Sequence, residues 1–210
     1  MLTSNPSRGH DGCNRSNAMP ELRNAAGRAT LVAWFVAMTL LSAGLLARHL
    51  LAMPTPTRTA RLGQHLLALR GTAPPAWLAV HVISSECRCS QRIVSHLLDS
   101  VRPAGWSEIV LWVGDLAPSV DLTRRFDVRR VTAADLATYE IEAAPLLVAV
   151  APDGAVRYAG GYTDRKQGPV IHDLELLAAA RSAIEIPALP LFGCATSERL
   201  QRALASLPTP

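Results

Sequence analysis

Two cysteines separated by one residue, Cys87 and Cys89, are the residues of this sequence whose type and spacing best suit chemistry. The chain has four cysteines in 210 residues, the others being Cys13 and Cys194, which is too few for a disulfide scaffold. A Cys-x-Cys pair therefore indicates redox chemistry or a metal site rather than a structural disulfide. Cys13 lies in a polar N-terminal segment, where we expect it to be incidental.

A disulfide between the two close cysteines is geometrically possible. Cysteines at positions i and i+2 can approach within the Cα separation of roughly 4.4–6.8 Å that a disulfide requires. The ring that this bond closes is smaller than that of a Cys-x-x-Cys pair, so its angles are less relaxed. Such strain makes a disulfide easier to reduce, and we expect a reduction potential above roughly −270 mV, typical of an oxidant or isomerase. Of the neighbouring charges, Arg88 favours a thiolate at Cys87 and Glu86 opposes it.

The same sulfur atoms could instead hold a soft metal ion. Thiolates at Cys87 and Cys89, completed by His172, His81 or Cys194, would suit copper(I) or zinc. His81 falls within a predicted strand and is expected to pack there. His172 begins a predicted helix and is the histidine we favour as a ligand. The redox interpretation requires no cofactor, whereas the alternative requires copper or another metal.

Regular elements that can position the pair begin at Trp77. The apolar, β-branched run Trp77–Ile83 predicts a buried strand, and the apolar residues after the cysteines recur at helical spacing up to Arg102-Pro103. The other expected elements are a strand at 109–113, a helix at 133–139 capped by Thr132, strands at 146–150 and 155–158 joined by a Pro-Asp-Gly turn, and a helix at about 173–184.

This order, with the cysteines between the first strand and the first helix, resembles the thioredoxin fold. The stretch from Asp135 to Gly161 resembles thioredoxin-like proteins in its helix, its Tyr-x-Ile exit, a proline that opens a strand, and a hairpin ending in glycine. The resemblance covers Trp77 to about Ile184. It implies an α/β domain with a central mixed sheet flanked by helices, and it implies that Pro145 is a cis-proline facing the cysteines.

A narrower resemblance is to membrane-anchored bacterial thioredoxin-like proteins, including those described as RedB-like. They share a Cys-x-Cys-Ser motif, here Cys87 to Ser90, and a late Phe-Gly-Cys motif, here Phe192 to Cys194. The chain departs from thioredoxins proper, which carry Trp-Cys-x-x-Cys, and Ala144 stands where many relatives have Thr or Val before the proline. These departures argue against ordinary reductase activity and leave the expected fold intact.

The resemblance assigns roles to the cysteines. Cys87 would be the nucleophile at a helix N-terminus, where the helix dipole favours a thiolate, and Cys89 would be the resolving thiol. Cys194 either docks beside them as a third thiol or remains a lone cysteine. The implied activity is that of a thiol–disulfide oxidoreductase acting on protein or small-molecule disulfides and thiols. The alternatives are a copper(I) or other metal chaperone of the same fold, and a non-catalytic thioredoxin-like binding domain.

A membrane anchor is predicted near the N-terminus. Residues 29–47 carry no charge, and as a helix they span about 28 Å, close to the hydrocarbon thickness of a bilayer. The polar leader and the apolar run are both longer than those of a cleaved signal peptide, so we expect an uncleaved single-pass anchor. Arginines are slightly more numerous before this run (Arg8, Arg15, Arg23, Arg28) than shortly after it (Arg48, Arg58, Arg61).

That charge difference weakly favours a cytoplasmic N-terminus in a bacterial inner (cell) membrane, with the large domain facing the periplasm or exterior. We expect a disordered leader at 1–27, the membrane helix at 29–47, a linker at 53–76, the thioredoxin-like domain at 77–185 and a C-terminal extension at 186–210. The net charge of +4 comes from arginines scattered along the whole chain, without a basic cluster that contains aromatic residues. This pattern argues against nucleic-acid binding.

Overall fold

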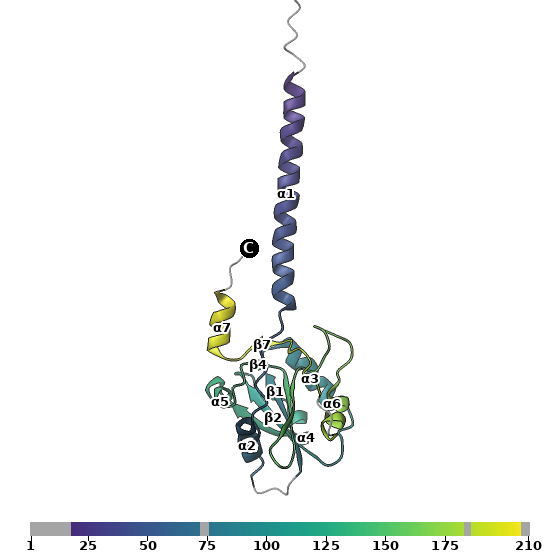
Figure 1. The fold of residues 1–210 in the computed structure, drawn as a ribbon, viewed down its shortest axis with the longest axis vertical. Coiled ribbons are helices and arrows are strands. Elements are labelled where there is room, and N and C mark those ends of the chain that lie inside the picture. The colour runs from purple at the N-terminus through teal and green to yellow at the C-terminus, as the bar shows by residue number, and fades with distance from the viewer. Residues whose placement is uncertain (1–17, 72–75, 183–185, 207–210) are drawn as a thin grey trace, which may run out of the picture. The chain divides into compact units, whose positions relative to one another are not determined.

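The computed structural model of the chain describes residues 18–71, 76–182 and 186–206 (Figure 1). The chain forms two compact units, an N-terminal one that ends at His49 and a second one that begins at Leu50. Cys13 and the first part of the expected leader lie outside the described residues.

The N-terminal unit contains one long helix, α1 (Ala18–Leu50). Its segment Gly27–Leu45 is long and apolar enough to cross a membrane, and none of it is buried by the rest of the chain. The prediction of an apolar helix at 29–47 is therefore confirmed in length and composition. The expected disorder of residues 18–27 is wrong, because α1 already includes them; a helix extends readily into adjoining residues once its first turns have formed.

The second unit contains the remaining elements. Its helices are α2 (Ala60–Ala68), α3 (Arg88–Asp99), α4 (Val120–Arg125), α5 (Ala133–Thr138), α6 (Asp173–Ala180) and α7 (Glu198–Ala205). Its strands are β1 (Trp77–Ser84), β2 (Trp106–Val113), β3 (Asp127–Val131), β4 (Ala143–Ala144), β5 (Leu146–Val150), β6 (Val156–Gly160) and β7 (Cys194–Ala195).

A five-stranded mixed sheet forms the centre of this unit, in the order β3-β2-β1-β5-β6. Strand β1 is parallel to β2 and antiparallel to β5, β2 is parallel to β3, and β5 and β6 form an antiparallel hairpin. A separate two-stranded sheet joins β4 to β7. The expected α/β class with a mixed sheet and flanking helices is confirmed.

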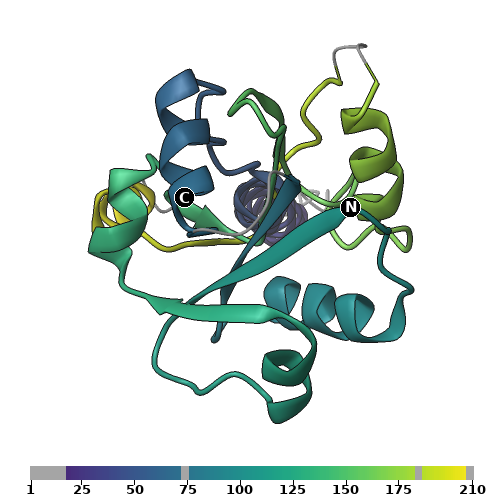
Figure 2. The same ribbon diagram turned by 90° about the horizontal axis from the view of Figure 1, so that it is seen from below.

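Both faces of the sheet are covered, as Figure 2 shows for the second unit. Helices α2 and α5 supply Leu62, Leu66 and Leu136 to the core on one face. Helices α3, α4 and α6 supply apolar residues to the other face. Side chains of a strand alternate between the two faces, so the central strand β1 is buried on both sides. Its run of apolar residues is the pattern by which it was predicted.

Three segments differ from the sequence-based expectation. The expected linker, in which one or two helical turns were predicted around Leu66, contains helix α2 and packs into the core: the Thr59 hydroxyl accepts a hydrogen bond from the N–H of Leu62, and Leu66 is completely buried. Helix α4 and the edge strand β3 were not predicted, because β3 is short and its sequence Asp-Val-Arg-Arg-Val is mostly polar. The expected C-terminal extension returns to the core, where Leu191 is 1% exposed.

Candidate functional site: a cluster of three thiols

The Cys87–Cys89 segment connects the end of β1 to the start of α3. Cys87 occupies the N-cap position and Cys89 lies in the first turn. Two side chains of that turn fix the connection: the Ser90 hydroxyl accepts a 3.0 Å hydrogen bond from the N–H of Ser84, and the Gln91 amide donates one of 2.7 Å to a carbonyl of the same loop. Cys87 and Cys89 were predicted to lie between the first strand of the domain and the helix that follows it, and this position is confirmed.

Cys194 lies directly against Cys87. Its sulfur is 2.7 Å from the Cys87 sulfur, although the two residues are 107 positions apart in the sequence. The pairing of β7 with β4, which sets Cys194 opposite Ala144, produces this approach. Of the two positions left open for Cys194, the structure has the one beside Cys87.

Pro145 lies at the same point of the fold. The Ala144–Pro145 peptide bond is cis, as the resemblance implied. The Ala144 carbonyl oxygen is 3.9 Å from the Cys87 sulfur, so the peptide bond before Pro145 lies beside that sulfur. Gly193 passes so close to this bond that an added Cβ would lie 1.9 Å from the Ala144 oxygen. Glycine is therefore required where the chain crosses the cis bond.

The three sulfur atoms differ in burial and in protonation. Cys87 is 1% exposed, Cys89 is half-buried and Cys194 is exposed. Hydrogen bonds from the Cys194 and Cys89 side chains lower the pKa of Cys87 to about 2, and the N–H groups at the start of α3 act in the same direction. The same hydrogen bonds, together with burial, raise the pKa values of Cys89 and Cys194. The hydrogen bonds of the cluster therefore favour the thiolate form of Cys87 and the thiol forms of Cys89 and Cys194.

We call residues 186–197, which carry Cys194 over the site, the strap. Several backbone hydrogen bonds hold it: the N–H of Gly161 donates to Leu189 (3.0 Å), the N–H of Met53 donates to Leu191 (2.7 Å), and the N–H of Thr196 donates to Glu142 (2.7 Å). Beyond the strap, the Arg199 guanidinium pairs with the Glu142 carboxylate. These contacts fix Cys194 through the surrounding backbone as well as through its own sulfur.

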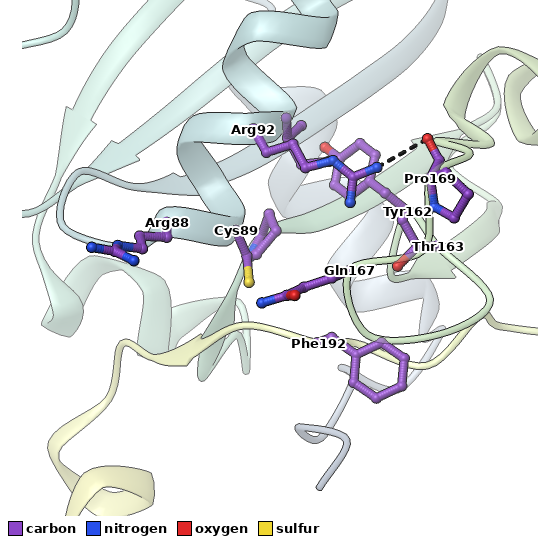
Figure 3. Close-up of a pocket in the computed structure, with 10 residues that line it drawn as sticks. Arg88, Cys89, Arg92, Tyr162, Thr163, Gln167, Pro169 and Phe192 are labelled. Atoms are coloured by element: carbon purple, nitrogen blue, oxygen red, sulfur yellow. Dashed lines mark hydrogen bonds between the residues drawn. The ribbon is translucent and has the colours of Figure 1, made fainter. Parts of the chain in front are cut away.

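A pocket of about 440 Å³ opens beside Cys89. Figure 3 shows Cys89 between Arg88 and Arg92, with its sulfur directed toward Gln167 and Phe192. The lining residues are Arg88, Cys89, Arg92, Ile93, Pro145, Tyr162, Thr163, Gln167, Pro169 and Phe192. Arg92 donates hydrogen bonds to the carbonyl groups of Gly168 and Pro169, so it also holds the loop that forms the opposite wall.

A buried polar network begins at the wall of this pocket. The Tyr162 hydroxyl is 2.9 Å from Nδ1 of His81, whose Nε2 is 2.9 Å from the Glu108 carboxylate. Glu108 in turn pairs with Arg102 at 2.7 Å, and Arg102 reaches the fully buried Asp173 at 2.7 Å. Buried charges are tolerated when they are paired and hydrogen-bonded, as here.

Two groups of this network have shifted pKa values. Burial by itself raises the pKa of Glu108, but the hydrogen bonds from His81 and Arg102 outweigh it and lower this pKa to about 2. Burial raises the pKa of Tyr162 well above its ordinary value, so Tyr162 is a neutral hydrogen-bonding group. The network therefore contains a stable carboxylate at Glu108.

The histidines named as possible metal ligands have other partners. His81 is fully buried in the polar network, and His172, the favoured candidate, pairs with Glu175 at 2.8 Å near the surface. In the part of the chain that the structure describes, no group of three or more His, Cys, Asp or Glu residues is arranged to hold a metal ion.

Sequence reasoning missed the pocket wall and the buried network. Arg92 and Tyr162 had no motif to mark them. Glu108, a charged residue directly before the apolar run of β2, and the histidine in strand β1 were signals of a buried polar pair, but the sequence does not show that the two strands place them together.

Comparison with known proteins adds little to these observations. No known protein-family model matches the chain, and no functionally curated protein matches its sequence. The crystal structure of an uncharacterised conserved protein from Geobacillus kaustophilus is similar to it, with a TM-score of 0.46 and 18% sequence identity. The similarity covers 59% of this chain and 77% of that one.

Proposed function

We propose that the protein is a membrane-anchored thiol–disulfide oxidoreductase whose exchange centre is the cluster of Cys87, Cys89 and Cys194. The observation that carries this proposal is the position of Cys87. Its sulfur lies 2.7 Å from that of Cys194 and accepts hydrogen bonds from both other thiols. Three thiols meeting at the start of a helix, one of them a thiolate, suit reversible disulfide exchange.

Burial suggests the order of the steps. A substrate disulfide reaches Cys89 or Cys194 more easily than Cys87, which is 1% exposed. We therefore propose that an outer thiol forms the mixed disulfide and that the Cys87 thiolate resolves it, which reverses the order implied by the resemblance. In the opposite direction Cys87 is the sulfur that departs, and a thiolate of low pKa departs fastest.

The proposed fold and location follow the same resemblance. A thioredoxin-like assignment is supported by the order of strands, by cysteines at the β1–α3 connection and by the cis bond before Pro145. A location in the bacterial cell membrane, with the thiol cluster on the periplasmic or outer side, is supported by the apolar segment of α1 and by the persistence of disulfides in oxidising compartments. The proposed partners are protein or small-molecule disulfides and thiols, and no cofactor is required.

Mass spectrometry of the full-length protein in detergent tests this function. The protein is equilibrated in thiol–disulfide buffers, its free thiols are alkylated, and it is digested with trypsin. Because trypsin cleaves after Arg88, Cys87 and Cys89 fall in different peptides and each disulfide can be assigned. We expect a reversible Cys87–Cys194 disulfide, its loss in Cys194→Ser, and a Cys87–Cys89 disulfide in that variant.

Two results would overturn the proposal. In one, no disulfide that includes Cys87 forms in any buffer. In the other, Cys87→Ser exchanges disulfides as fast as the unchanged protein, which would favour a binding domain without catalysis. Copper(I) added to a parallel sample tests the alternative that the protein is a metal chaperone. One tightly bound copper ion per chain, lost in both Cys87→Ser and Cys89→Ser, would support that alternative instead.

A further inference from the structure

We propose that the pocket beside Cys89 binds a carboxylate-bearing, low-molecular-weight disulfide, and that Cys89 is the thiol with which this substrate first exchanges. This inference rests on the proposed function and specifies its substrate class. It comes from the contrast between the two cysteines of the pair: Cys89 lines the pocket, whereas Cys87 is buried behind it and is not part of the wall.

The charge of the pocket selects an anionic ligand. Arg88 and Arg92 both line it, and neither has a carboxylate partner among the residues that the structure describes. No aspartate or glutamate belongs to the described lining. The hydrogen bond to Cys87 and burial raise the pKa of Cys89, and the charges of Lys166 and Arg92 oppose this shift in part, so positive charge reaches the Cys89 sulfur. Figure 3 shows the guanidinium groups of Arg88 and Arg92 on opposite sides of Cys89, and that of Arg92 already donates to two carbonyl groups of the opposite wall. A carboxylate placed here would pair with one guanidinium group, which binds planar anions in paired hydrogen bonds, and would be attracted by the charge of the other.

The shape and remaining lining of the pocket fit a small molecule. Its volume of about 440 Å³ lies in the range typical of small-ligand sites, roughly 300–1,000 Å³. Ile93, Pro145 and Phe192 supply apolar surface for the carbon and sulfur atoms of a disulfide, and Thr163 and Gln167 supply polar groups at the side. Figure 3 shows the Cys89 sulfur directed into the space bounded by Gln167 and Phe192, where the substrate disulfide would lie.

The exchange balances without any further reactant when the cluster starts reduced. The Cys87 thiolate first takes the Cys89 proton along their hydrogen bond, and the Cys89 thiolate attacks one sulfur of the substrate RSSR. The S–S bond breaks, and the departing RS⁻ takes the proton back from Cys87, which is again a thiolate. The Cys87 thiolate then attacks the Cys89 sulfur and releases the second RS⁻, which leaves a Cys87–Cys89 disulfide. Finally the Cys194 thiol attacks Cys87, and Cys89 departs and takes its proton. Two electrons pass from Cys87 and Cys194 to RSSR, which becomes one thiol and one thiolate.

Single-turnover kinetics of the reduced full-length protein in detergent test the substrate class. Three probes are compared: glutathione disulfide, which carries carboxylates, bis(2-hydroxyethyl) disulfide, which is neutral, and cystamine, which is cationic. We expect glutathione disulfide to react fastest relative to its intrinsic reactivity, and this preference to weaken as salt is added. Arg88→Gln should lower the ratio of the glutathione disulfide rate to the neutral-probe rate by about two- to fivefold, as expected for a partly exposed ion pair.

The matched control is Arg124→Gln, which removes an exposed arginine of α4 outside the pocket and should leave the ratio unchanged. Taking the ratio to the neutral probe cancels any effect of Arg88→Gln on thiol reactivity itself. Cys89→Ser should abolish the preference among probes even where Cys87 and Cys194 still become oxidised. An unchanged ratio in Arg88→Gln, with normal exchange of all probes, would overturn the substrate class and leave the proposed function standing.

A binding measurement that needs no redox chemistry tests the anion-binding pocket independently of the oxidoreductase function. If no probe reacts, the proposed oxidoreductase function fails, and calorimetry with S-methylglutathione still tests the pocket. We expect this unreactive anion to bind the unchanged protein and Arg124→Gln, and to bind Arg88→Gln more weakly. Absence of binding to the unchanged protein would overturn the anion site.

Discussion

Replacing Gly193 by alanine is expected to draw Cys194 away from Cys87 without altering any cysteine. In the structure a Cβ on residue 193 would lie 1.9 Å from the Ala144 oxygen and 2.7 Å from a ring carbon of Pro145. Ordinary contact begins at about 3.4 Å, so the strap and the Ala144 backbone must separate by about 1.5 Å. The clash is with backbone, which cannot rotate away as a flexible side chain can.

The size of the effect follows from the cost of such overpacking, about 1–3 kcal/mol. A disulfide between Cys87 and Cys194 requires the strap in place, so its formation should become less favourable by the same amount, which is about 5- to 150-fold in the equilibrium constant. The Cys87–Cys89 pair lies within one turn of chain and does not depend on the strap. We therefore expect the equilibrium to shift from the Cys87–Cys194 to the Cys87–Cys89 disulfide.

The assay is equilibration of the variant in glutathione buffers of graded potential, followed by peptide mapping of each disulfide. Gly71→Ala is the control: Gly71 has a φ of 64° and open space around it, so alanine strains the backbone there by about 1–2 kcal/mol away from the strap. That control should lose stability and keep the Cys87–Cys194 equilibrium. An unchanged Cys87–Cys194 equilibrium in Gly193→Ala would show that the strap does not position Cys194.

Three further predictions concern the core, the polar network and the thiolate. Leu66→Ala should lower the free energy of unfolding by about 2–5 kcal/mol in denaturant titrations, because Leu66 is 0% exposed, whereas Leu116→Ala at a 58% exposed position should change it little. The pKa of Glu108 is about 2 in the folded protein, against an ordinary value of 4.5. The ionised Glu108 should therefore stabilise the fold by on the order of 3 kcal/mol above pH 4.5, and this stabilisation should be lost as the pH falls toward 2. Glu108→Gln should remove this pH dependence from acid unfolding curves. Cys194→Ala should raise the pKa of Cys87, because it removes a hydrogen bond that stabilises the thiolate. In an acid titration of the reduced protein, the thiolate absorbance should then disappear at a higher pH than in the unchanged protein. An unchanged titration midpoint would contradict the assigned hydrogen bond.

Local patterns were sufficient to predict the central elements of the fold. The apolar runs of β1 and β5 predicted buried strands, and the Pro-Asp-Gly turn predicted the hairpin that joins β5 to β6. Thr132 caps α5 as expected, with its hydroxyl and the Asp135 carboxylate forming a capping box. These features depend on neighbours a few residues apart, which is the range over which a sequence can be interpreted directly.

Segments whose structure depends on distant partners were not predicted in this way. Strand β3 is polar and short, and it becomes a strand because β2 offers it a free edge. Residues 60–68 contain only a few apolar side chains, which predicted no more than one or two helical turns in a linker, and the packing of Leu62 and Leu66 on the sheet makes this helix part of the core. In both cases tertiary contacts outweighed weak local preference.

The sequence by itself determined which sulfur atoms are present and that two of them flank one residue at the start of a helix, and the resemblance to thioredoxin-like proteins implied a cis-proline at Pro145. Only the tertiary structure decided which sulfur atoms meet. Cys194 reaches Cys87 because Gly193 crosses the Ala144–Pro145 bond and β7 pairs with β4, an approach of residues 107 positions apart. The physical reason is that spacing along the chain governs contacts within one element, whereas contacts between elements depend on burial and backbone pairing of the whole fold.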